Sequence, residues 1–66
     1  MDPAARIAFI NSQVTCAQIR AMGMQAENQS RVHSGDEVKY FEKDFETLIQ
    51  EYRIDYNSVI GYLTGR

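Results

Sequence analysis

The first 33 residues carry two apolar stripes at helical spacing, and this pattern constrains the fold more than any other feature of the sequence. The first stripe alternates strictly between three and four residues and comprises Ile7, Ile10, Val14, Ala17, Ala21 and Met24, followed by Asn28. The second stripe comprises Ala5, Phe9, Ser12, Cys16, Ile19, Gly23 and Ala26. At 100° per residue the two stripes lie on roughly opposite sides of one helix. A helix in a chain of 66 residues has one side to offer its own core, so we expect the other side to meet a second copy.

Helix-boundary signals divide the chain into three segments. Asp2 is a good N-cap, Pro3 suits the first helical position, and Gly35 is a natural left-handed stop. The predicted helices span residues 3–33, 42–52 and 56–63. The segment 36–40 reads as a loop, although Ser34 and Glu37 also match a capping box that would start the next helix early. The fold class is therefore all-α, a single domain over residues 1–66, in which one long N-terminal helix is followed by two short helices that form a helical hairpin.

The sequence also makes one prediction about the long helix and one about the third helix. Gly23 interrupts the long helix, which indicates either a tight helix crossing or a kink. The inner side of the third helix is predicted to comprise Tyr56, Val59, Ile60 and Leu63.

Self-association is expected because so short a chain buries only about 60% of its surface on folding. In an antiparallel pair of long helices, Ile7 would stack on Met24, Ile10 on Ala21 and Val14 on Ala17, so that large residues meet small ones in two of these layers. The predicted subunit interface is thus the first stripe: Ile7, Ile10, Val14, Ala17, Ala21 and Met24. The alternative is that this stripe packs on the later helices of the same chain while the second stripe is only partly buried.

The inventory of reactive side chains favours binding over catalysis. His33 stands alone near a helix end, Cys16 reads as a small buried thiol, and the carboxylates show no metal-ligand spacing. We therefore expect no catalytic residue, no metal and no cofactor. The single cysteine and the absence of a signal-peptide pattern or membrane span predict a cytoplasmic protein. A net charge of −2 gives no electrostatic footprint for nucleic acid or a membrane.

Residues 45–63 resemble a helix-turn-helix of the repressor type. The apolar positions of that motif are held here by Leu48, Tyr52, Ile54, Val59 and Tyr62. The resemblance implies a DNA-binding regulator, with Asn57 reading a base and Arg53 on phosphate. Ile49 replaces the small residue of the motif, Arg53 replaces its turn glycine, and Asp55 would face a polyanion. Lys43, Arg53 and Arg66 are too few for the phosphate contacts of specific binding, so two helices packed against the first helix is the favoured alternative.

Two further groups of side chains are candidates for contacts. Tyr40 and Tyr62 lie off the inward stripes and suit an exposed patch. The candidate partner-binding residues are Tyr40, Arg53, Tyr56, Asn57 and Tyr62. Arg6, Arg20 and Arg31 share one edge of the long helix and could hold a small nucleotide where protomers meet; the alternative is a solvated polar edge.

The Met-Asp-Pro-Ala-Ala-Arg-Ile opening and the Asn-Ser-Val-Ile-Gly-Tyr-Leu close resemble small accessory proteins of bacteriophages and prophages. That resemblance implies a protein that binds a host factor, in some cases to counter host defence by blocking a protein or sequestering a nucleotide. The leading hypothesis is therefore a homo-oligomeric, non-enzymatic protein that occupies and inhibits a host protein through its second and third helices.

Overall fold

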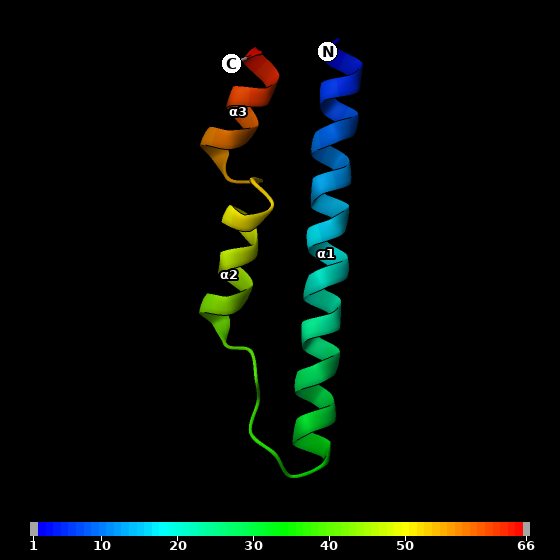
Figure 1. The fold of residues 1–66 in the computed structure, drawn as a ribbon, viewed down its shortest axis with the longest axis vertical. Helices are drawn as coiled ribbons and strands as arrows, with labels where there is room; N and C mark the ends of the chain where they lie inside the picture. The colour runs from blue at the N-terminus through cyan, green and yellow to red at the C-terminus, as the bar shows by residue number, and fades with distance from the viewer. Residues whose placement is uncertain (1, 66) are drawn as a thin grey trace.

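The computed structural model describes residues 2–65 and confirms an all-α hairpin. Helix α1 spans Pro3–His33, α2 spans Glu42–Glu51 and α3 spans Tyr56–Thr64. Figure 1 shows α2 and α3 following one another, end to end, along the side of the straight helix α1. Within residues 2–65, α2 and α3 each contact α1 and make no helix contact with one another. We call α2 and α3 together the second arm of the hairpin, which bends at residues 52–55.

This arrangement agrees with the favoured alternative to a helix-turn-helix, in which the two short helices pack against the first helix. In that motif the two helices are joined by a short turn and cross at a large angle, which lets the second helix enter a groove of DNA. Here both short helices lie along α1 instead (Figure 1). The physical reason is that α1 is long enough to cover the apolar sides of α2 and α3 at the same time.

Local hydrogen bonds explain where α1 begins and ends. The carboxylate of Asp2 accepts from the N–H of Ala5 at 2.7 Å, which caps the first turn. At the other end Gly35 has a φ of 83°, as its place in the sequence predicts. The N–H of Asp36 donates to the carbonyl of Arg31 at 2.7 Å, and that of Gly35 to Val32 at 3.0 Å. This is a Schellman motif, which satisfies the last carbonyls of the helix.

The second arm starts later than the capping-box alternative predicts. Residues 36–41 are not helical, and α2 is capped by the Asp44 carboxylate, which accepts from the N–H of Phe41 at 2.8 Å. The negative charge of Asp44 also suits the positive end of the helix dipole. In α3 the carboxylate of Asp55 accepts from the N–H of Ser58 at 3.2 Å, so Asp55 is the cap that the sequence indicates.

The core lies between α1 and the second arm and is small. Its buried members are Ala17, Met24 and Leu48, which are 6%, 2% and 6% exposed. Ile10 and Val14 are half-buried beside them. Most of the first stripe therefore packs inside its own chain, because α2 and α3 already cover it. The chain therefore already buries Ala17 and Met24 by itself, and the antiparallel contact between two copies stays a prediction.

Five other residues depart from the sequence prediction. Cys16 is exposed, because it faces away from the second arm. Apart from its chain neighbours and the backbone of its own helix, Gly23 has no atom within 4 Å of the point where a Cβ would sit, so no other helix crosses closely there. On α3, Tyr56, Leu63 and Ile60 are 79%, 47% and 40% exposed, although the sequence predicts them on the inner side. Val59 is half-buried as predicted, and its inward neighbour is Tyr62, which is also half-buried.

Candidate functional site

Two side-chain amides on α1 fix the position of the second arm. The Oδ1 atom of Asn28 accepts from the backbone N–H groups of Lys39 and Tyr40, both at 3.0 Å, and its Nδ2 donates to the carbonyl of Tyr40 at 2.8 Å. Gln13 donates through Nε2 to the carbonyl of Tyr52 at 3.2 Å. Asn28 therefore holds the chain just before α2, and Gln13 holds the chain just after α2. The only sequence signal for this role is that Asn28 continues the first stripe with a polar residue.

The structure keeps the three candidate arginines apart. A helix rises about 1.5 Å per residue, so Arg6 and Arg20 are separated by roughly 21 Å along α1, and Arg20 and Arg31 by roughly 16 Å. Each also has a contact inside the chain. Arg20 lies over the ring of Tyr40, 5.6 Å from its centroid, and the Nε of Arg31 pairs with Glu27 at 3.1 Å.

The guanidinium of Arg6 lies beside Gly65 at the end of the hairpin where α3 ends. Its guanidinium nitrogens lie 2.9 Å from where a Cβ at Gly65 would be. Three arginines spaced in this way do not converge on one nucleotide within a single chain. The edge that carries Arg6, Arg20 and Arg31 is thus a row of separate intramolecular contacts.

The five candidate partner-binding residues fall into two groups, of which the first, Tyr40 and Tyr62, packs within the chain. Tyr40 is half-buried, with the Nζ of Lys39 5.3 Å from its ring centroid. The ring of Tyr62 packs edge-on against Phe9, with centroids 5.1 Å apart and an interplanar angle of 71°. These two tyrosines belong to opposite ends of the second arm and are occupied within the chain. They do not form the exposed patch that their spacing suggests.

The remaining three residues, Arg53, Tyr56 and Asn57, gather where α2 gives way to α3, and we call them the corner patch. All three are exposed. Arg53 has a φ of 55° and is the only residue other than glycine with a positive φ in the part of the chain described. The N–H of Ile54 donates to Ile49 at 2.9 Å, and that of Arg53 to Gln50 at 3.1 Å, so α2 also ends in a Schellman motif.

Asp55 adds a fixed negative charge within the corner. Its carboxylate accepts hydrogen bonds from the side chain of Ser58 and from backbone N–H groups at the start of α3, and these hold the pKa of Asp55 below its ordinary value. The carboxylate is committed to capping α3, while the neighbouring side chains of Arg53 and Tyr56 remain open to solvent.

A second surface runs along one broad face of the hairpin. In an antiparallel pair of helices, the residue directly after an inward-facing residue turns toward the same face in both helices. Gln18 and Gln25 follow the buried Ala17 and Met24, while Ile49 follows Leu48. The same rule brings further residues to this face. We call the whole set the uncharged face: Ile7, Asn11, Val14, Gln18, Gln25, Gln29, Val32, Ile49, Ile60 and Leu63.

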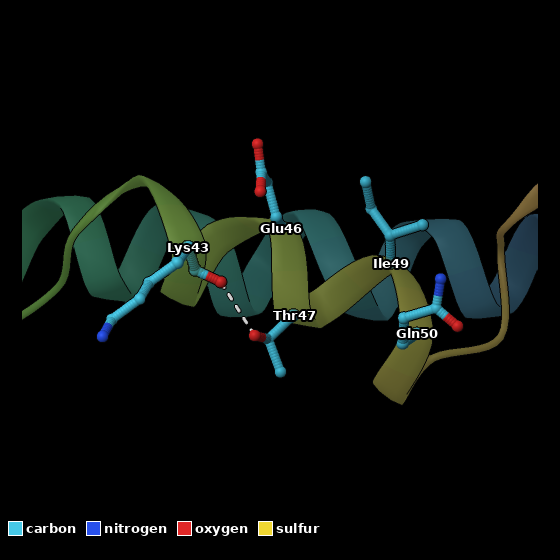
Figure 2. A pocket seen from close by; sticks show the side chains of 5 residues that line it. All are labelled: Lys43, Glu46, Thr47, Ile49 and Gln50. Atoms are coloured by element: carbon cyan, nitrogen blue, oxygen red, sulfur yellow. Dashed lines mark hydrogen bonds between the residues drawn. The ribbon is translucent and has the colours of Figure 1, made fainter.

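Charge is segregated between the two flanks of α1. The charged side chains Arg6, Arg20, Glu27 and Arg31 lie on the flank opposite the uncharged face. The division is weaker on α2, where Figure 2 shows Ile49 and the charged Glu46 projecting from one side and Lys43 and Thr47 from the other. The open hollow that these residues line on the outer side of α2 also includes Glu46 and Gln50. A second hollow, beside Val32 and Gln29, lies at the loop end of the uncharged face.

Comparisons with protein-family models, with curated proteins and with solved structures find no match for the chain. Among residues 2–65, no group of three His, Cys, Asp or Glu side chains is placed to hold a metal ion. No helix of the described chain combines the length and the apolar character that crossing a membrane requires.

Proposed function

We propose that this protein is a non-enzymatic binding protein that occupies a protein of a bacterial host through the corner patch. The observation that carries this proposal is the backbone conformation of Arg53. Gly35 and Gly65 follow helix ends in the left-handed conformation, with φ of 83° and 78°, and Arg53 adopts the same conformation after α2. A left-handed residue with a side chain costs about 1–2 kcal/mol, a cost that glycine avoids.

Strain of this kind is typical of functional positions, because a side chain is kept where another residue would stabilise the fold better. Tyr56 supports the same interpretation, since 79% of it is exposed. Tyrosine and arginine are the residue types that most often dominate binding energy at protein interfaces. A tyrosine ring fills an apolar pocket and its hydroxyl bonds at the rim, while the guanidinium of Arg53 suits a carboxylate. The expected partner therefore offers an apolar pocket beside an acidic group.

The resemblance to small phage and prophage proteins supports a host factor as the partner. A host protein held in this way would be blocked, as in the anti-defence proteins of that class. In this proposal the protein acts as a homo-oligomer in the host cytoplasm, so that each particle presents more than one corner patch and gains avidity.

Affinity capture from bacterial lysates tests the proposal. The protein and the variants Tyr56→Ala, Arg53→Gly and Lys43→Ala are immobilised in parallel. Lys43→Ala is the matched control, because Lys43 is an exposed cation on the same arm but outside the corner patch. A stoichiometric protein retained by the wild type and by Lys43→Ala, and reduced at least about tenfold by the two corner variants, is expected.

Capture that is equal for all four proteins would show that the corner patch is not the binding surface. No stoichiometric protein on the wild type would overturn the proposal as a whole. Arg53→Gly is informative because it removes the side chain while relieving backbone strain, so a loss of capture is not a loss of folding.

A further inference from the structure

The exposed area of the chain is larger than a compact monomer of its size presents. The accessible surface is 5138 Å². For a mass of 7.6 kDa the scaling for folded monomers gives about 4,300 Å². The excess, about 850 Å², is close to the roughly 800 Å² that each partner contributes to a standard interface. The radius of gyration, 15.2 Å, likewise exceeds the value of about 11 Å for a compact domain of this length.

The excess apolar surface is concentrated on the uncharged face. Ile7, Ile49 and Ile60 are 51%, 43% and 40% exposed there. Leu63 and Val32, on the same face, are 47% and 61% exposed. The backbone outline of the hairpin is 50 by 18 Å, so one broad face covers about 900 Å², which is enough for a stable interface.

The charge pattern indicates what covers this face. A two-fold axis sets a surface against its own copy, so any charge near the axis meets a charge of the same sign. The flank of α1 on the uncharged face has no charged residue from Ile7 to Val32. Its polar members are asparagine and glutamine, whose amides both donate and accept and can therefore pair with their own copies. Charge depletion is also the mark of an interface core.

We infer that two copies of this chain pair through the uncharged face, as a two-fold dimer in which the two hairpins stack face to face as two layers, each with α1 beside its second arm. The second stripe of α1, with Cys16 and Ile19, stays outside this contact. Arg53 and Asn57 of the corner patch lie outside the uncharged face, whereas Tyr56 stands four residues before Ile60 and borders it. The inference is therefore argued, and tested, without the corner patch. The interface shares Ile7 and Val14 with the one that the sequence predicts and differs in its other members, because Ala17 and Met24 are buried in the core.

Light scattering over a range of concentrations tests the inference. The wild type is expected to have twice the mass of the chain, about 15 kDa. Gln18→Lys places a cation at the middle of the uncharged face, and Ile60→Glu places an anion on its second arm. Each is expected to raise the dissociation constant of the dimer at least about tenfold. Helix content by circular dichroism must be retained, so that dissociation is not confused with unfolding.

Two matched controls assign the face. Thr15→Lys introduces the same charge on the outer side of α1, where Thr15 is exposed, and Ile19→Lys introduces it on the second stripe. Both are expected to leave the dimer intact. A wild type that stays monomeric, or a dimer that Ile19→Lys dissociates and Gln18→Lys does not, would overturn the inference.

These measurements separate the inference from the proposed function. The measurement of solution mass needs no host protein. Arg53→Gly is expected to remain a dimer but to capture no host protein. A dimer without capture would therefore refute the corner patch alone, and capture by a monomer would refute the dimer alone.

Discussion

The side-chain amide of Asn28 binds both the N–H and the carbonyl of Tyr40, at 3.0 and 2.8 Å. It replaces the two partners that this backbone unit would have in a sheet, and it also accepts from the N–H of Lys39. The residue before α2 is thus anchored to α1 by one side chain. This contact sets where the second arm begins to run back along α1.

Removing that amide is expected to destabilise the fold. Asn28→Ala leaves the N–H groups of Lys39 and Tyr40 and the carbonyl of Tyr40 without their partner. We expect this loss to lower the free energy of unfolding by about 2 kcal/mol. For a domain of this size each kcal/mol lowers the melting temperature by roughly 4–8 °C. Thermal and urea unfolding followed by circular dichroism measure both quantities. Ser30→Ala changes an exposed residue of α1 outside the uncharged face and is the control. Equal effects of the two variants would contradict the anchoring role.

Arg53→Gly is expected to stabilise the protein by up to about 1 kcal/mol. Glycine adopts the left-handed conformation without the side-chain clash, and part of the gain is offset by its greater freedom in the unfolded chain. Arg53→Ala keeps the strain and serves as the control, with little change expected. Urea unfolding of the three proteins gives the comparison. If the alanine variant were as stable as the glycine variant, relief of backbone strain would not be the cause.

The stability of the protein is expected to depend on the ionisation of Asp55. The pKa of this carboxyl is lower in the folded chain than its ordinary value. Its contribution is therefore fully present above the unfolded value of about 3.9 and is lost as the pH falls below that value and through the folded pKa. Asp55→Asn keeps a capping oxygen that does not titrate.

Urea midpoints measured from about pH 6 down to about pH 2 test this dependence. The wild type is expected to lose more stability over this range than Asp55→Asn. Parallel curves for the two proteins would show that Asp55 makes no ionisation-dependent contribution.

The thiol of Cys16 is expected to react freely in the folded protein. Because Cys16 is exposed and lies outside the uncharged face, a thiol reagent should modify it at nearly the same rate in buffer and in denaturant. Cys16→Ser is expected to change the free energy of unfolding by less than about 0.5 kcal/mol. A thiol that is protected in the dimer and reactive in the monomer would place the second stripe in the contact between copies.

Local signals in the sequence were sufficient for the helix ends. Asp2 and Pro3 start α1 and Gly35 stops it, because capping and the left-handed stop depend only on neighbouring residues. The inward side of α3 was harder to predict. Tyr56, Ile60 and Leu63 are apolar at helical spacing, and periodicity alone does not tell a buried side from an apolar side left open.

The contacts between distant segments could not be predicted from periodicity. The anchor at Asn28 depends on a loop returning to within hydrogen-bond distance of α1, over a separation of 12 residues. The sequence also offered two stripes for burial, and the choice of the first depended on how α2 and α3 align with α1. The uncharged face depends on the antiparallel pairing of α1 with the second arm, which decides which residues of the two arms share a side.

The contact between Arg6 and Gly65 has a practical meaning for anyone who attaches this protein to a support or a fluorophore. Helix α1 begins and α3 ends at the same end of the hairpin (Figure 1). Pro3 and Thr64 therefore lie at one end of the hairpin, while the loop that joins α1 to α2 lies at the far end. A label introduced in that loop would report on the molecule without disturbing its ends.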